Sequence, residues 1–349
     1  MKTSIYTDNN LNANGAQHKV GAFSWLRNPH LLTVLPLLKR ESRFSLRQQA
    51  YEALIPVDKE SVLLAKCHLQ KEVRSFPTLL LVHGLEGSSE SPYILRLAGK
   101  ALDKGFNVVR LNLRNCGNTL HLSPRLYNAG SSEDLLLVID WLVERQGHQE
   151  IFLIGYSLGG NLVLKTGAEL DSRPKIISGI CAISPSVDLA KSVAALDKGF
   201  NQVYQYKFLW TLKNKILRKA KLFPARYDAR KLDAVKTIRI FDDLYTAPDG
   251  GWKDAASYYR EASSLQLING ISLPSLIITA KDDPLVPFES FQKINNKLIK
   301  LIAPNHGGHV GLMSRTENNC LAKSRDLFWT DEAILEFCLS HMKAAKWRD

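Results

Sequence analysis

The pentapeptide GYSLG at residues 155–159 is the part of the sequence best suited to covalent chemistry. It has the G-x-S-x-G spacing, and it lies between an apolar run at 151–154 and a helical pattern at 158–170. A serine on a sharp turn from strand to helix holds its Oγ clear of the sheet, and small flanking residues relieve backbone contacts. We therefore expect Ser157 to be a nucleophile, with the Leu158 N–H at the start of the helix as an oxyanion donor.

A serine hydroxyl is a weak nucleophile at neutral pH and needs a base, which in turn is oriented by an acid. In the chain order typical of this turn, the acid follows the serine and the histidine comes last. Asp282 and Asp283 follow an apolar segment at 275–280, and we prefer Asp283 because of its spacing from the next Val-Pro pair. His306 and His309 in the glycine-rich stretch that follows are both candidates for the base.

A second oxyanion donor is expected in the sequence VHGLEGS at 82–88, where the Leu85 N–H is the candidate. We interpret His83 in this loop as a structural residue rather than the base. The His306 and His309 pair has no carboxylate or cysteine at ligand spacing, so we expect no metal. The chemistry of such a triad needs no cofactor, and we expect none.

The apolar segments and helical patterns alternate along the chain. Strand-like segments are expected at 61–69, 78–82, 107–113, 151–154, 176–183, 275–280 and 297–302, and helices at 93–104, 132–145 and 158–170. This alternation predicts an α/β fold with a mostly parallel, twisted sheet and helices on both faces. We expect a loose tail at 1–20, one domain at 21–349, and within it an inserted cap at about 185–262, where the alternation is interrupted.

Composition indicates a globular protein rather than a fibrous or disordered one. The chain has 349 residues, of which 45% are hydrophobic and 23% charged. The polar N-terminus lacks the apolar region of a signal peptide, and no uncharged stretch resembles a membrane span. The five cysteines have no C-x-x-C spacing, which favours reduced thiols and a cytoplasmic protein.

The net charge of +12 is concentrated in one segment, because residues 205–240 contain eleven Lys or Arg and two Asp. Within it, 206–219 predicts a helix whose apolar face comprises Phe208, Leu209, Leu212, Ile216 and Leu217, with Lys on the other face. We expect this helix to pack on the core with a solvated basic face. Peripheral contact with a membrane is the alternative, whereas no motif supports nucleic-acid binding.

With these residues in view, the sequence resembles the YheT-like branch of the α/β-hydrolase superfamily. The similar blocks are FSWLRNPHLLTVLP at 23–36, HGLEGSSESPY at 83–93, the segment 241–264, DDPLVP and GGHVG. The resemblance covers about residues 20–345. It implies a triad of Ser157, Asp283 and His309, and a serine hydrolase acting on carboxylic esters; eukaryotic members act on phospholipids and acylglycerols. Asn115 and Leu312 depart from the branch's pattern and bear on substrate preference.

We therefore expect a carboxylesterase or lipase-like enzyme whose substrate is a small-molecule ester or a lipid. A different interpretation is a catalytically idle scaffold that binds an anionic lipid or nucleic acid through the basic cap. Thioester or amide cleavage and acyl transfer use the same attacking groups, so the sequence does not separate them from ester hydrolysis.

Overall fold

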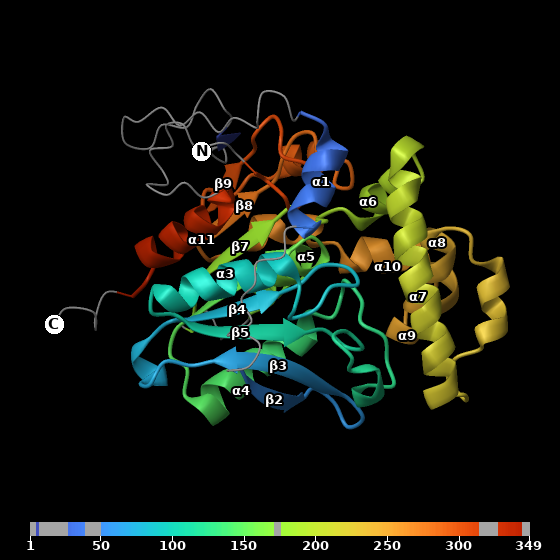
Figure 1. Ribbon diagram of the computed structural model, residues 1–349, viewed down its shortest axis with the longest axis horizontal. Coiled ribbons are helices and arrows are strands. Elements are labelled where there is room, and N and C mark those ends of the chain that lie inside the picture. Colours follow the sequence, from blue (N-terminus) through green and yellow to red (C-terminus); the bar gives the residue numbers. More distant parts are fainter. Residues whose placement is uncertain (1–4, 7–26, 39–49, 171–175, 314–326, 344–349) are drawn as a thin grey trace.

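The computed structural model describes residues 5–6, 27–38, 50–170, 176–313 and 327–343. Their strands form one mixed sheet in the order β1-β9-β8-β7-β6-β4-β5-β3-β2 (Figure 1). The strands are β1 (Ile5–Tyr6), β2 (Tyr51–Pro56), β3 (Val62–His68), β4 (Thr78–Val82), β5 (Asn107–Asn112), β6 (Ile151–Tyr156), β7 (Ile177–Ile183), β8 (Ser275–Ile278) and β9 (Ile299–Ile302). The pairs β2–β3 and β3–β5 are antiparallel, and the other pairs are parallel.

The central strands are continuous apolar runs because both faces of the sheet are covered. In β4, Leu79 and Leu81 face one hydrophobic cluster, while Leu80 and Val82 face another. The first cluster includes residues of helices α3 (Pro92–Asp103) and α11 (Trp329–Ser340). The second includes residues of α4 (Ser132–Gln146) and α5 (Leu158–Ala168). The mostly parallel sheet with helices on both faces, expected from the sequence, is confirmed.

In the chain, a group of helices follows β7 and precedes β8. These helices lie beyond the carboxyl ends of the strands (Figure 1). They are α6 (Leu189–Leu196), α7 (Gln202–Leu222), α8 (Ile238–Phe241), a π-helix (Asp242–Thr246), α9 (Ala247–Gly250) and α10 (Ala255–Ala262). We call residues 185–262 the insertion. Figure 1 shows α7 as a long helix that runs along one side of the molecule.

Strand β2 and helices α1 and α11 are among the described elements that were not predicted from the sequence. Strand β2 buries only Ala53 and Ile55, so its apolar pattern is short. Helix α1 (Pro29–Leu38) carries Pro36 within it, and its apolar residues fall on more than one face. Of the expected tail at 1–20, only β1 lies within the described residues, where it pairs with β9.

The prediction that the lysines of α7 lie on a solvated face was wrong for two of them. Leu209, Leu212 and Ile216 are buried as expected, but Lys215 and Lys219 are buried too, and Leu217 is exposed. The two lysines turn inward because the core offers each a polar partner, described below. Within the described residues, no helix is both long and apolar enough to cross a membrane.

Candidate functional site

Ser157 lies at the turn between β6 and α5, as the N-cap of that helix. Its backbone has φ 55° and ψ −118°, a strained conformation for a residue with a side chain. The turn is tight because a Cβ at Gly155 would lie 2.2 Å from the Gly159 carbonyl oxygen, and one at Gly159 would lie 2.4 Å from the His83 oxygen. These close contacts explain why the G-x-S-x-G spacing is needed here.

His309 and Asp283 extend from Ser157 in a hydrogen-bonded row. The Nε2 of His309 lies 2.9 Å from the Ser157 Oγ, and its Nδ1 lies 2.9 Å from the Asp283 Oδ2. The other oxygen of Asp283 accepts hydrogen bonds from the N–H groups of Leu285 and Val286. The Asp283 side chain is fully buried, so its carboxylate is held in one orientation toward His309.

The alternative residues, Asp282 and His306, pair with each other instead. The His306 Nδ1 lies 3.0 Å from the Asp282 Oδ2, and the His306 side chain is 42% exposed. Asp282 also accepts hydrogen bonds from the N–H groups of Gly307 and Gly308. The Asp282–His306 pair therefore shapes the loop that carries His309. The Asp283–His309 pair, by contrast, lies against Ser157.

Helix α1 supports the histidine loop, a role the sequence did not reveal. The His309 N–H donates a hydrogen bond of 2.9 Å to the Oγ1 of Thr33, which is buried in α1. The next residue, Val310, has φ 64° and donates to the Oγ of Ser184 at the end of β7. The block at 23–36 carries part of the resemblance, and no spacing in it predicts a contact with His309.

The loop after β4 brings Leu85 to the same cavity as Ser157, Leu158 and His309. As the first residue of α5, Leu158 has an N–H without an acceptor inside the helix. The residue after Leu85, Glu86, has φ 54°, and its N–H donates to the Tyr127 hydroxyl at 3.0 Å. Both residues expected to supply oxyanion donors therefore line the cavity beside the serine.

His83 lies beneath this loop and holds it. Its Nδ1 lies 2.8 Å from the Gly84 carbonyl oxygen, and its Nε2 accepts a hydrogen bond from the Leu113 N–H. Complete burial lowers the pKa of His83 to about 4, which keeps the imidazole neutral. A neutral ring has one donor and one acceptor, so it satisfies both contacts.

An ion pair that the sequence did not predict joins the insertion to the loop after β4. The Nζ of Lys215 in α7 bonds to the Oε1 of Glu86, and both side chains are largely buried. The same Nζ lies 4.5 Å from the centre of the Tyr127 ring, and the Tyr127 hydroxyl donates to the same Glu86 oxygen. Because the partners are 129 residues apart, no local pattern could have indicated the pair.

The cavity beside Ser157 is lined mainly by apolar side chains of the insertion. They include Leu189, Val193, Leu196, Phe208, Leu212, Ile238 and Phe241. Among its polar lining residues is Asp242, whose carboxylate accepts a hydrogen bond of 2.7 Å from the Tyr259 hydroxyl. Burial raises the pKa of Asp242 to about 6. An apolar cavity of this kind suits a hydrocarbon group better than a charged one.

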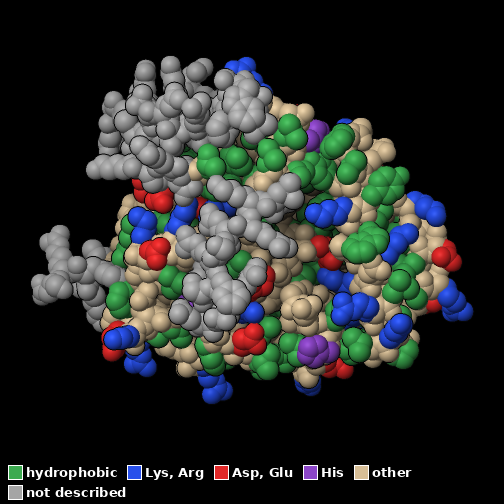
Figure 2. All heavy atoms as spheres, viewed as in Figure 1, with side chains coloured by type: hydrophobic (Ala, Val, Ile, Leu, Met, Phe, Trp, Pro, Cys, Tyr) green, Lys and Arg blue, Asp and Glu red, His purple; other side chains and the backbone are tan. Residues whose placement is uncertain are grey.

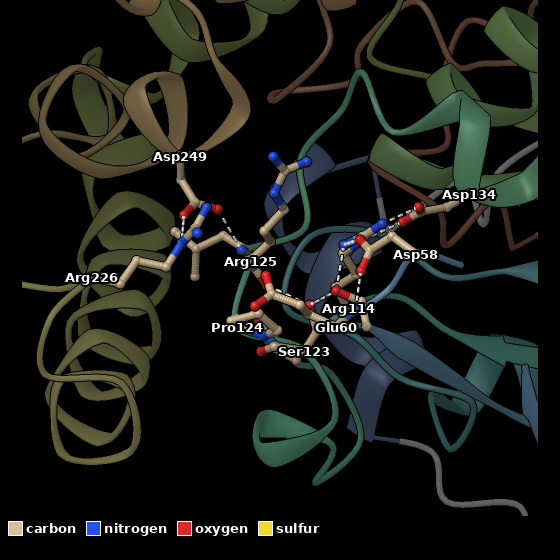
Figure 3. Close-up of polar contacts among 12 residues, drawn as sticks. Asp58, Glu60, Arg114, Ser123, Pro124, Arg125, Asp134, Arg226 and Asp249 are labelled. Atoms are coloured by element: carbon tan, nitrogen blue, oxygen red, sulfur yellow. Dashed lines mark hydrogen bonds and ion pairs between the residues drawn. The ribbon is translucent and has the colours of Figure 1, made fainter. Parts of the chain in front are cut away.

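Figure 3 shows a network of polar contacts, part of which joins the insertion to the rest of the chain. Arg114, after β5, forms ion pairs with Asp134 at the start of α4 and with Asp58. Asp249, in α9 of the insertion, accepts a hydrogen bond from Arg226, also in the insertion, and another from the Leu126 N–H, which lies outside it. The Lys219 Nζ also donates to the Ser123 carbonyl oxygen. Among the described residues, no cluster of His, Cys, Asp and Glu suits a metal ion.

Comparison with known proteins places this geometry in a family. The family model "alpha/beta hydrolase fold" matches residues 77–316. The chain is 35% identical to the protein YheT of Escherichia coli (strain K12) over 83% of this chain and 85% of YheT. It is 29% identical to the monoacylglycerol lipase of Saccharomyces cerevisiae over 67% of this chain, and 26% identical to the mouse phospholipase ABHD3 over 68%. The chain spans 54% and 58% of those two proteins, respectively.

The solved structures agree on the fold. The esterase Pf2001 of Pyrococcus furiosus superposes with a TM-score of 0.58 at 19% identity, covering 87% of this chain and 96% of the esterase. The family model and the match to YheT together show that the chain belongs to the α/β-hydrolase superfamily, in its YheT-like branch.

Proposed function

We propose that this protein is a serine hydrolase that cleaves carboxylic esters, with Ser157 as the nucleophile. The observation that carries the proposal is the hydrogen-bonded row from Asp283 through His309 to Ser157. Relatives whose names include an esterase, a lipase and a phospholipase support hydrolysis as the general activity.

In the first half of the reaction, Ser157 Oγ attacks the ester carbonyl while His309 Nε2 accepts the hydroxyl proton. Asp283 orients the ring and stabilises the imidazolium that forms. The backbone N–H groups of Leu85 and Leu158 donate to the oxygen of the tetrahedral intermediate. His309 then gives the proton to the departing alkoxide, which leaves as the alcohol and yields an acyl-enzyme.

In the second half, water attacks the acyl carbonyl and gives a proton to His309. Collapse of the second tetrahedral intermediate releases the carboxylic acid, and the proton returns to Ser157. Every bond made or broken lies on the substrate, the water or these side chains, so the proposed reaction uses no cofactor.

We further propose that the substrates are lipid-like esters such as acylglycerols or phospholipids, and that the enzyme binds them at a membrane surface. The apolar lining that Leu189, Leu196 and Phe208 give to the cavity supports an acyl chain as its occupant. The names of the yeast and mouse relatives support the same class of substrate.

The test is hydrolysis of p-nitrophenyl esters from acetyl to palmitoyl by the wild type and by Ser157→Ala. We expect turnover that Ser157→Ala abolishes, with an optimum at a chain length that fills the cavity. Ser186→Ala is the matched control, because Ser186 also lines the cavity but has no contact with His309 among those found in the described residues. Turnover that survives in folded Ser157→Ala would contradict the mechanism.

A further inference from the structure

The outward side of α7 is unusually apolar for a surface helix. Val203, Tyr206, Trp210 and Leu217 are 55%, 68%, 69% and 45% exposed. Their spacing of three, four and seven residues places them along one line of the helix. We call these four residues the α7 outer stripe.

The outer stripe does not serve the protein's own core. The opposite side of α7 already buries Leu209, Leu212 and Ile216, and Phe208 and Leu212 line the cavity beside Ser157. The helix thus has two apolar sides, whereas packing on the sheet domain needs only one. Two large aromatic side chains, Tyr206 and Trp210, remain exposed to water with no role in folding that the structure reveals.

The charge around the outer stripe has one sign. Residues 198–226 contain eight Lys or Arg and no Asp or Glu. Lys215 and Lys219 point inward, but Lys207, Arg218 and Lys221 are exposed. Within the described part of the chain, these three cations form no ion pair, so they are available to an anionic partner.

The apolar surface continues beyond α7. Phe200, just before the helix, is 58% exposed, and its ring lies 4.5 Å from the ring of His30 in α1. The exposed side of α1 carries Leu31, Val34 and Leu35. Figure 2 shows hydrophobic and basic side chains interleaved over α7, with further hydrophobic side chains over α1.

We propose that the α7 outer stripe, together with Phe200 and the exposed side of α1, docks on the surface of an anionic lipid bilayer. Trp and Tyr side chains favour the interface between headgroups and hydrocarbon. Flanking Lys and Arg side chains bind anionic headgroups, and an amphipathic helix can lie in that plane with its apolar side inserted.

The one-sign charge argues against a second copy of the chain as the occupant. A two-fold contact brings the same surface patch of both copies together. Lys207, Arg218 and Lys221 would then face their own counterparts, and like charges across an interface are unfavourable. A bilayer that contains anionic lipid supplies the opposite charge and also a place for the apolar side chains.

This inference extends the proposed function, because the inner side of α7 lines the cavity beside Ser157. Docking through the outer stripe would hold the cavity about one helix diameter, roughly 10 Å, from the lipid surface. The ester bonds of membrane lipids would then lie close to the nucleophile. Docking itself requires no catalysis. Failure of the vesicle-binding experiment would therefore contradict docking without contradicting ester hydrolysis by Ser157, and the reverse also holds.

The test is co-sedimentation of the full chain with vesicles of phosphatidylcholine alone or mixed with phosphatidylglycerol. We expect binding to the anionic vesicles that weakens at high salt, and Ser157→Ala should bind as the wild type does. The double variant Tyr206→Ser, Trp210→Ser should lose about tenfold or more in vesicle affinity. Its hydrolysis of a soluble short-chain ester should stay unchanged, which shows that it is folded.

Leu54→Ser is the matched control, because Leu54 is 58% exposed on the edge strand β2. It should bind vesicles as the wild type does. Equal binding by the double variant and the wild type, or no binding by the wild type, would overturn the proposal. So would light scattering that shows a wild-type dimer and a monomeric double variant, since the stripe would then be an interface between copies.

Discussion

Lys215 in helix α7 forms a buried ion pair with Glu86, the residue that follows Leu85 in the loop after β4. A side chain of the insertion therefore holds the loop whose backbone N–H we expect to bind the oxyanion. Glu86 has a positive φ, so the backbone there depends on its surroundings for support.

Lys215→Met should lower both stability and kcat. Loss of the cation leaves the Glu86 carboxylate buried and unpaired, which should reduce the free energy of unfolding by about 3 kcal/mol. The loosened loop should lower kcat by about tenfold on short and long esters alike, because the oxyanion donor is less well placed. Urea denaturation and steady-state kinetics measure the two effects.

Lys213→Met is the control for Lys215→Met, because Lys213 is only half-buried and does not line the cavity. Adding Glu86→Gln to Lys215→Met removes the unpaired charge and should restore part of the stability. If Lys215→Met keeps the wild-type kcat, the ion pair does not position the oxyanion loop.

Substitutions should separate the two neighbouring acid–histidine pairs. Asp283→Asn should lower kcat by about 10,000-fold, because the amide favours the wrong tautomer of His309. Asp282→Asn keeps the oxygen that accepts from Gly307 and Gly308, and it should stay within about tenfold of the wild type, since a partly exposed pair contributes little. Steady-state kinetics of both variants on one ester measure the two values of kcat. A larger loss in Asp282→Asn than in Asp283→Asn would assign the role of the acid to Asp282.

Replacing Gly159 by alanine should disrupt the turn at Ser157. The added Cβ would lie 2.4 Å from the His83 oxygen and 2.5 Å from the Val82 oxygen, and both are backbone atoms. We expect a loss of about 1–3 kcal/mol in the free energy of unfolding together with a large fall in activity. Gly270→Ala, with no atom within 4 Å of the new Cβ, should be neutral. Thermal and urea unfolding measure the difference, and a stable, active Gly159→Ala would mean that the turn adapts.

Stability should fall in mild acid through His83. Its pKa is about 4 in the folded state against an ordinary value of 6.5, so the unfolded state binds the proton more readily. The contribution of His83 is therefore complete above about pH 6.5 and is lost at up to about 1.4 kcal/mol per pH unit as the pH falls toward 4.

Urea denaturation from pH 7.5 to pH 5 should show a flatter profile for His83→Gln than for the wild type. Asp242, whose pKa is raised to about 6, acts in the opposite direction, but it is present in both proteins and cancels in the comparison. His121→Gln, at an exposed position, is the control. Parallel profiles for His83→Gln and the wild type would contradict the assignment to His83.

Much of the sheet could be predicted because its central strands are apolar on both faces. The segment 78–82 matches β4 at both ends, and 107–113 and 176–183 match β5 and β7 within one residue. Such runs are distinctive in a sequence, whereas the edge strand β2 has only two buried side chains and was missed. The roles of Ser157, Asp283 and His309 stay predictions, although the fold brings the three side chains together as the chain order implied.

Contacts between distant segments could not be predicted. Lys215 and Lys219 look like solvent-facing residues of an amphipathic helix, and their buried partners, Glu86 and Ser123, lie far away in the sequence. Thr33, which binds the N–H of His309, is separated from it by 276 residues. Each of these contacts depends on how the insertion and α1 pack, which local periodicity does not encode.

The two inward lysines also bear on how a substrate enters. If α7 swung outward as a rigid lid, the Lys215–Glu86 pair and the hydrogen bond from Lys219 to Ser123 would both break. Water would hydrate the separated charges, so the ion pair itself contributes little to the cost of opening. The buried side chains Leu209, Leu212 and Ile216 would also be exposed, at about 1.5–3 kcal/mol each, and an open conformer would therefore be populated to less than about 1%. A substrate would therefore reach Ser157 chiefly through rotamer changes of lining side chains such as Phe208 and Leu189, with α7 remaining in place.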